Sequence, residues 1–103
     1  MSNKKKLKFK DIIKRHQLTL IDFSAAWCGP CKAMEPVLKD LSSRVGDKAK
    51  IIKIDVDKNR NLSDKMQIRG VPTFMLFKKG KMLWRQSGMQ SRNTLESLIE
   101  QHA

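Results

Sequence analysis

Residues 27–32 read Trp-Cys-Gly-Pro-Cys-Lys, and they hold both cysteines of this 103-residue chain. The stretch follows an apolar run at 18–23 that is typical of a buried strand, and it precedes an apolar-periodic run that predicts a helix. Two thiols three positions apart on a strand-to-helix turn can close into a small disulfide and reopen. Reversible thiol–disulfide chemistry at this turn is the first functional hypothesis.

The two cysteines are expected to have different roles. Cys28 would lie just ahead of the first helical turn, where unpaired N–H groups and the positive end of the helix dipole favour the thiolate. Cys31, one turn further in, would point towards the protein and attack a mixed disulfide formed at Cys28. The pattern therefore predicts Cys28 as the nucleophile and Cys31 as the resolving thiol.

The other residues of the turn suit this chemistry. Gly29 lets the turn approach a partner closely, and Pro30 fits the first helical turn because its missing N–H would have been unpaired there. Lys32 adds a positive charge nearby. Trp27 offers a flat apolar surface that either packs under the loop or contacts a substrate.

Three other interpretations of the cysteine pair are weaker. A zinc site needs four ligands, and His16 and His102 lie on opposite sides of the pair at no zinc-finger spacing. A structural disulfide would be a poor staple because so short a loop constrains the unfolded chain little. Two inert buried thiols fit badly with an exposed Gly-Pro turn. We therefore favour the redox interpretation.

Length and composition indicate one domain that folds without disulfides or metals. A chain of 103 residues with 40% hydrophobic side chains is large enough for a single core. Its basic start is not followed by an apolar run of signal-peptide length, and its longest apolar runs are too short to span a bilayer. We expect a cytoplasmic protein without a membrane span.

The charge is strongly basic. The formal net charge is +12 at pH 7, and half of this excess lies in the first fifteen residues, where seven basic side chains accompany one acid, Asp11. A basic surface can steer acidic partner proteins or contact nucleic acid or an anionic membrane. Nucleic-acid binding is disfavoured because no aromatic or glycine pattern of a nucleic-acid module accompanies the charge. We divide the chain into a basic N-terminal arm, 1–8, and a domain, 9–103.

Asp22 is the one acid in the apolar run at 18–23. A carboxyl group there, six residues before Cys28, would be buried behind the turn, and desolvation disfavours its ionised form. It is placed to take and return the proton of Cys31, although an ordinary strand-end aspartate paired to a backbone N–H or a lysine is the alternative. Lys53, in the next predicted strand, is either the charge partner of Asp22 or extends to the sheet edge.

The remaining chain divides into short elements. We expect a short amphipathic helix at 9–16, a helix from Cys31 that continues past Pro36 and stops at Gly46, a strand at 50–56, a polar helix at 59–66, a hairpin of strands at 74–77 and 81–86, and a last helix capped by Ser91. Pro72 belongs at the first position of a strand or in a turn, where a cis bond is possible. Gly88 suggests a bulge or a close backbone approach.

Together these residues resemble the thioredoxin family from about residue 9 onward. The shared features are the motif at 27–32, Asp22, Pro36, Lys53, the Gly-Val-Pro-Thr stretch at 70–73, Gly80 and Gly88. The resemblance implies an α/β thioredoxin fold, in which a central mixed sheet of four or five strands is flanked by helices. The first strand is expected to be short or absent, because the start of the chain is shorter than the family pattern.

The resemblance also implies a mechanism. Cys28 attacks a substrate disulfide, Cys31 resolves the mixed disulfide, Asp22 assists proton transfer, and Lys53 tunes Asp22. Pro72 is expected to be cis and to lie against the cysteine pair.

The same resemblance implies a substrate-binding surface and an electron source. Val71 would offer main-chain hydrogen bonds to an extended target segment, within an apolar rim formed by Trp27, Gly29, Pro30, Val71 and Gly88. Electrons would come from NADPH through thioredoxin reductase, with no cofactor or metal bound to a chain that we expect to be monomeric.

Several alternatives stay open. A disulfide isomerase or oxidase on the same fold is one, although Gly29 and Pro30 between the cysteines resemble reducing members. A thioredoxin-like interaction subunit that needs the surface but not the thiols is another, and a basic adaptor for nucleic acid or membranes is the third. Ser24 stands where the family usually carries an aromatic residue, which bears on packing behind the turn.

Overall fold

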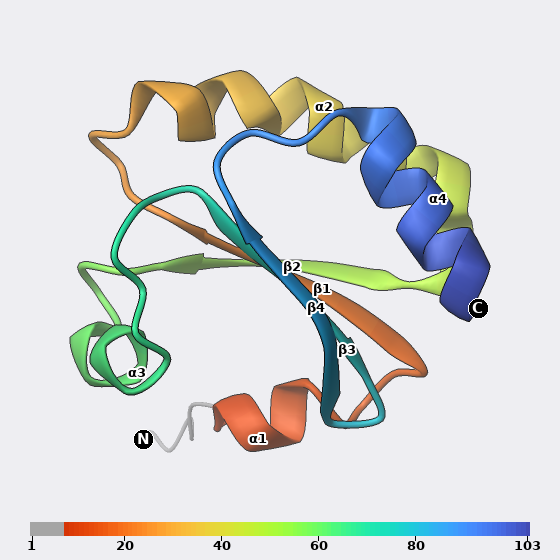
Figure 1. Ribbon diagram of the computed structural model, residues 1–103, viewed down its shortest axis with the longest axis horizontal. Helices are drawn as coiled ribbons and strands as arrows, with labels where there is room; N and C mark the ends of the chain where they lie inside the picture. Colours follow the sequence, from red (N-terminus) through yellow and green to blue (C-terminus); the bar gives the residue numbers. More distant parts are fainter. Residues whose placement is uncertain (1–7) are drawn as a thin grey trace, which may run out of the picture.

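The structure is a computed structural model, and it describes residues 8–103 (Figure 1). Most of the arm predicted at 1–8 therefore lies outside the described residues. A mixed sheet of four strands, in the order β2-β1-β3-β4, forms the centre of the described part. The strands are β1 (Leu18–Ser24), β2 (Lys50–Asp55), β3 (Thr73–Lys78) and β4 (Lys81–Ser87). β1 runs parallel to β2 and antiparallel to β3, which forms an antiparallel hairpin with β4.

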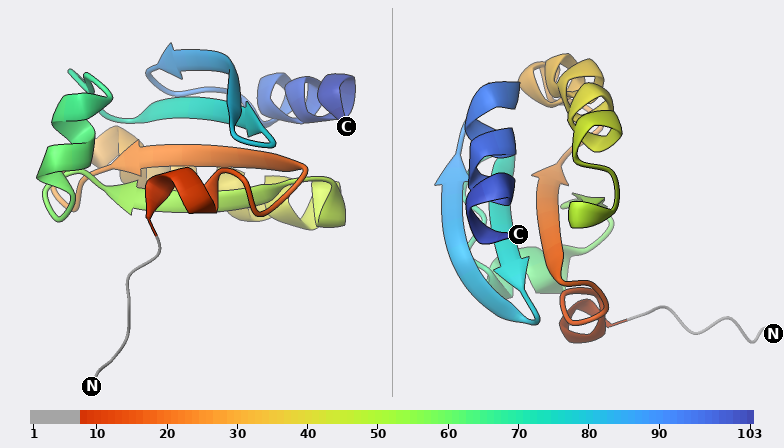
Figure 2. Two further views of the ribbon diagram at one scale, coloured as in Figure 1. Left: turned by 90° about the horizontal axis from the view of Figure 1, so that it is seen from below. Right: turned by 90° about the vertical axis from the view of Figure 1, so that its right-hand side faces the viewer.

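Helices cover both faces of this sheet, as Figures 1 and 2 show. They are α1 (Phe9–Ile12), α2 (Gly29–Val45), α3 (Arg60–Lys65) and α4 (Arg92–His102), with a short 3-10 helix η1 (Gly46–Lys48) after α2. α2 and α4 lie on one face, and α1 and α3 lie on the other. The expectation of a mixed sheet with four or five strands and flanking helices is confirmed, and no strand precedes β1 within residues 8–103.

β1 is the buried centre of the sheet, and all seven of its residues are buried. Because successive side chains of a strand point to opposite faces, Leu18 and Leu20 pack under α2 and α4, whereas Ile21 and Phe23 pack with residues of α1 and α3. A strand covered on both faces was predicted here, and it is confirmed. β1 carries the chain to residues 27–32, which follow its C-terminal end.

α2 begins directly at the cysteine motif. The N–H of Cys31 donates to Sγ of Cys28, the N-cap residue, over 3.1 Å, and Pro30 lies in the first turn. The helix continues past Pro36 and ends before Gly46, whose φ of +54° is favourable for glycine. The predicted stop at Gly46 is confirmed, and the helix begins at Gly29, two residues earlier than Cys31.

The first helix is shorter than predicted. α1 covers Phe9–Ile12, whereas the sequence pattern predicted 9–16. Beyond Ile13 the next four residues are all polar, so a further turn would have no apolar side chain to pack against the sheet. The backbone instead leaves the helix, and the carbonyl of Gln17 accepts the N–H of Lys79 over 3.2 Å.

The bulge suggested at Gly88 is not there. The register shift of the hairpin lies between Leu76 and Phe77. Gly88 follows β4 with a φ of +92°, which glycine adopts readily, and its N–H donates to the carbonyl of Pro72 over 2.8 Å. Its backbone angle, rather than a bulge, accounts for the glycine.

The other predicted elements lie where the sequence placed them. α3, β3 and β4 each match their predicted ends to within one residue. The Ser91 hydroxyl accepts the N–H of Thr94 over 3.1 Å and so caps α4 as expected. Within residues 8–103 no helix combines the length and apolar character needed to cross a bilayer.

Candidate active site

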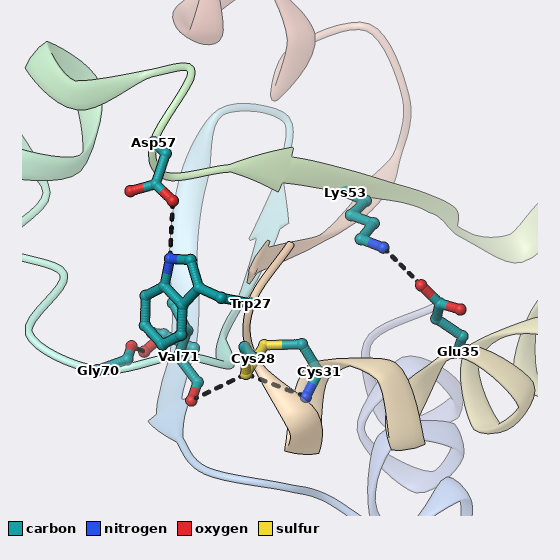
Figure 3. Close-up of a disulfide and its surroundings, with 9 residues drawn as sticks. Trp27, Cys28, Cys31, Glu35, Lys53, Asp57, Gly70 and Val71 are labelled. Atoms are coloured by element: carbon teal, nitrogen blue, oxygen red, sulfur yellow. Dashed lines mark hydrogen bonds and ion pairs between the residues drawn. A yellow bond between two sulfur atoms is a disulfide. The ribbon is translucent and has the colours of Figure 1, made fainter. Parts of the chain in front are cut away.

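A disulfide joins Cys28 and Cys31 across the first turn of α2, with Cα atoms 5.2 Å apart (Figure 3). Only 3% of Cys28 and 2% of Cys31 are exposed, whereas Gly29 and Pro30 between them are exposed. Both cysteines are therefore buried to nearly the same degree in the oxidised protein. The pairing leaves neither sulfur free as a zinc ligand in this state of the protein.

The loop before β3 lies against this disulfide. The Val71–Pro72 peptide bond is cis, as the family resemblance implied, and Pro72 is buried. Val71 packs against the cluster of buried residues that contains both cysteines. Its carbonyl oxygen lies 3.6 Å from Sγ of Cys28, a position in which it would accept a hydrogen bond from the thiol of the reduced protein.

Trp27 lies on the surface and does not pack under the loop. It is 70% exposed, and its indole N–H donates to Oδ2 of Asp57 over 2.8 Å. The ring borders a groove of about 150 Å³, whose other lining residues are Val56, Ile68, Arg69, Gly70 and Val71. The apolar side of the indole is therefore available to a partner beside Val71. Asp57 holds the ring there, and the sequence analysis did not single it out.

Asp22 lies in β1, on the face that α2 covers. It is 1% exposed, and its burial raises the pKa of its carboxyl from 3.8 to about 6, against the opposing effect of Lys53. Within the described residues, no group donates a hydrogen bond to its Oδ1 atom. The buried carboxyl predicted from the sequence is confirmed, and the alternative of an aspartate paired to a lysine is not seen.

Lys53 is the register partner of Asp22 across β1 and β2, but its ammonium group is directed elsewhere. Its Nζ forms an ion pair with Oε2 of Glu35 over 2.9 Å. It therefore acts on Asp22 through space and not by contact. Glu35 was missed by the sequence analysis, although its place four residues after Cys31 put it on the same side of α2.

The remaining predicted rim residues gather near the disulfide. Gly29 and Pro30 are exposed at the start of α2, and Gly88 is exposed and bonded to the carbonyl of Pro72. Gly88 thus meets the loop that carries Val71, and Trp27 borders the groove that Val71 lines. The structure thus brings together residues from three separate segments of the chain, 27–30, 71–72 and 88.

A thiol–disulfide oxidoreductase needs a disulfide that can open and close, beside a loop that an extended segment can reach. The site of this chain has both features. The thioredoxin family model matches residues 1–101, and the chain belongs to the thioredoxin family. Membership of this family supports the activity of the chain as a protein-disulfide reductase, and it confirms the fold that the resemblance implied.

Individual relatives agree with this assignment. Thioredoxin from Bacillus subtilis is 40% identical over 85 residues, which cover 82% of each protein. Thioredoxin from Rickettsia felis is 37% identical over 86 residues, covering 84% of this chain and 82% of that protein.

Solved structures lead to the same family. A mutant thioredoxin from Halobacterium salinarum superposes with a TM-score of 0.82 at 40% identity, covering 90% of this chain and 80% of that one. Oxidised mitochondrial thioredoxin 3 from Saccharomyces cerevisiae superposes with a TM-score of 0.81 at 34% identity, covering 90% of this chain and 86% of that one.

Proposed function

We propose that Cys28 is the attacking thiol of this reductase and that Cys31 resolves the mixed disulfide. The observation that carries this assignment is the position of Cys28 at the N-cap of α2, where its Sγ accepts the N–H of Cys31 over 3.1 Å. A thiolate at Cys28 would be stabilised by the same N–H and by the positive end of the helix.

The reaction then proceeds in two exchanges. The Cys28 thiolate attacks one sulfur of a substrate disulfide, and the other substrate sulfur leaves as a thiolate that takes up a proton. Cys31 loses its proton and attacks Sγ of Cys28, which releases the second substrate thiol. The substrate gains two electrons and two protons, and the protein is left with the Cys28–Cys31 disulfide of this structure.

Asp22 is proposed as the group that accepts the proton of Cys31. Burial raises the pKa of its carboxyl to about 6. A general base works best when its pKa lies near the working pH, so this value suits a base in neutral solution. Its place on the face of β1 that α2 covers puts it on the protein side of the disulfide, and Lys53 lowers the pKa of Asp22 from the neighbouring strand.

The substrate is proposed to bind as an extended segment along Val71. Backbone groups next to Pro72 can pair with such a segment as a neighbouring strand would, and the carbonyl of Val71 already lies 3.6 Å from Sγ of Cys28. Trp27, Gly29, Pro30 and Gly88 would complete the contact rim. Recognition through the backbone suits a reductase that acts on many proteins.

Trp27→Ala is expected to raise the KM for a protein disulfide severalfold while leaving the reduction of a small aromatic disulfide nearly unchanged. The indole is 70% exposed beside the groove, so it contributes contact area to a protein segment and not to the sulfur chemistry. Steady-state kinetics on both substrates measure this. An equal loss on both substrates would place Trp27 in the chemistry instead.

Electrons are proposed to come from NADPH through thioredoxin reductase, with the chain working as a cytoplasmic monomer. The named thioredoxins among its relatives support this cycle. The test is an assay that contains the chain, thioredoxin reductase, NADPH and insulin. Oxidation of NADPH that requires all four components is the expected result, and the absence of turnover with several bacterial reductases would refute the electron source.

A further inference from the structure

Polar side chains of β1 and β2 gather on the sheet face that α2 covers. Asp22 and Ser24 alternate with Ile21 and Phe23, which pack on the opposite face, so both polar residues point towards α2. The parallel register sets two residues of β2, Lys53 and Asp55, beside Asp22 and Ser24, respectively. The carboxyl of Asp22 thus belongs to a polar cluster between the sheet and α2.

A cavity of about 300 Å³ opens beside this cluster, and α2 supplies part of its wall. It is lined by Ser24, Ala25, Ala26, Cys31, Lys32, Glu35, Lys53 and Asp55. Glu35 and Lys53 meet in an ion pair over 2.9 Å (Figure 3). Because 57% and 52% of their side chains are exposed, the pair lies at the solvent end of the cavity. Cys31 lies on the same wall of the cavity, one helical turn before Glu35.

Four charged residues line this cavity. Lys53 and Asp55 come from β2, and Lys32 and Glu35 come from α2. Oδ1 of Asp55 is already held by the N–H groups of residues 57 and 58, over 2.8 and 3.1 Å. On the β3 side the register partner of Asp22 is Phe74, which carries no charge. Lys53 is therefore the cation whose position matters most to Asp22.

We propose that Glu35 is a positioning residue, which binds Lys53 and so holds the ammonium group at the mouth of the cavity, away from the buried carboxyl of Asp22. The inference rests on the proposed role of Asp22 as proton acceptor for Cys31. An ammonium group free to approach would stabilise the aspartate anion, because Lys53 already lowers the pKa of Asp22 from its place in the ion pair. The negative charge of Glu35 also raises this pKa directly, so the test has to separate the two effects. Glu35 keeps Asp22 protonated to a higher pH than Lys53 alone would allow.

The test is the titration of Asp22, followed by NMR of the oxidised protein labelled with ¹³C at the aspartate carboxyl carbons. Glu35→Gln is expected to lower the midpoint of the Asp22 titration by a few tenths of a pH unit, as suits a partly exposed ion pair. Lys53→Gln is expected to raise it. Glu100→Gln is the matched control. It breaks an exposed ion pair of similar length, 2.8 Å, between Lys48 and Glu100 of α4, and it should leave the Asp22 midpoint unchanged.

The double variant decides whether Glu35 acts through Lys53. If it does, Glu35→Gln shifts the Asp22 midpoint less in the Lys53→Gln background than in the parent protein. An equal shift in both backgrounds would show that Glu35 acts by its own charge alone, and no shift in the parent would show that the ion pair has no effect. Either result overturns the proposal.

Failure of the proposed function gives a different signature. If Asp22→Asn leaves the pH profile for release of a mixed disulfide by Cys31 unchanged, Asp22 is not the proton acceptor. The NMR titration of the Glu35 variants still decides the positioning, because it follows the carboxyl itself and not the activity.

Discussion

Cys28→Ser is expected to abolish disulfide reduction, with a loss of rate of roughly a thousandfold or more. A serine hydroxyl is not ionised near neutral pH, and it cannot form the mixed disulfide through which exchange proceeds. The N-cap position that favours a thiolate at Cys28 gives the serine hydroxyl no comparable reactivity. The measurement is single-turnover reduction of insulin by the dithiol protein and by the variant.

Cys31→Ser is the matched variant, and its expected result is different. It keeps the attacking thiol and removes the resolving one, so it should accumulate a mixed disulfide with a protein substrate, visible as a higher-mass species without reducing agent. Cys28→Ser should form none. A trapped species with Cys28→Ser and not with Cys31→Ser would reverse the proposed roles.

Asp22→Asn is expected to raise the free energy of unfolding by about 2–3 kcal/mol at pH 8 and by much less at pH 4. Burial raises the pKa of the carboxyl from 3.8 to about 6 in the folded protein. Each pKa unit is worth about 1.4 kcal/mol. The carboxyl of the unfolded chain gives up its proton at a lower pH than the carboxyl of the folded protein. The native protein therefore loses stability as the pH rises from about 4 to about 6, and this loss remains at every higher pH.

Urea unfolding of the oxidised proteins, followed by tryptophan fluorescence, measures this difference. Asp64→Asn is the control, because Asp64 is exposed on α3 and its substitution should change stability little at either pH. Destabilisation by Asp22→Asn at both pH values would contradict the account, because it would mean that the buried carboxylate is stabilised by the native structure.

Local sequence signals were sufficient for much of the site. The cysteine turn, the burial of Asp22 and the end of α2 before Gly46 follow from an apolar run, a C-G-P-C spacing and a glycine, each of which acts within a few residues. The Ser91 cap is equally local. The cis bond before Pro72 was expected from the resemblance and not from the chain's own chemistry, which leaves both isomers open.

Contacts between distant segments were not predictable in the same way. Register places Lys53 beside Asp22, but the direction of a long, flexible side chain depends on which carboxylate α2 presents, and that is Glu35. Trp27 had two possible positions until the structure showed its indole N–H on Asp57, thirty residues away. The predicted end of α1 was wrong because the four residues after Ile13 are polar, and a further helical turn would have no apolar side chain to pack against the sheet.

The central claim is that this chain is a reductase, and the equilibrium reduction potential of the Cys28–Cys31 pair tests it most directly. The reduction potential of thioredoxin is about −270 mV, and that of protein disulfide isomerase is about −180 mV. The value expected for this chain therefore comes from its membership of the thioredoxin family and not from the geometry of the site. Equilibration with glutathione buffers, followed by thiol alkylation and mass spectrometry, gives the value. A potential near −270 mV is expected, and one near −180 mV would contradict the account and favour the isomerase alternative.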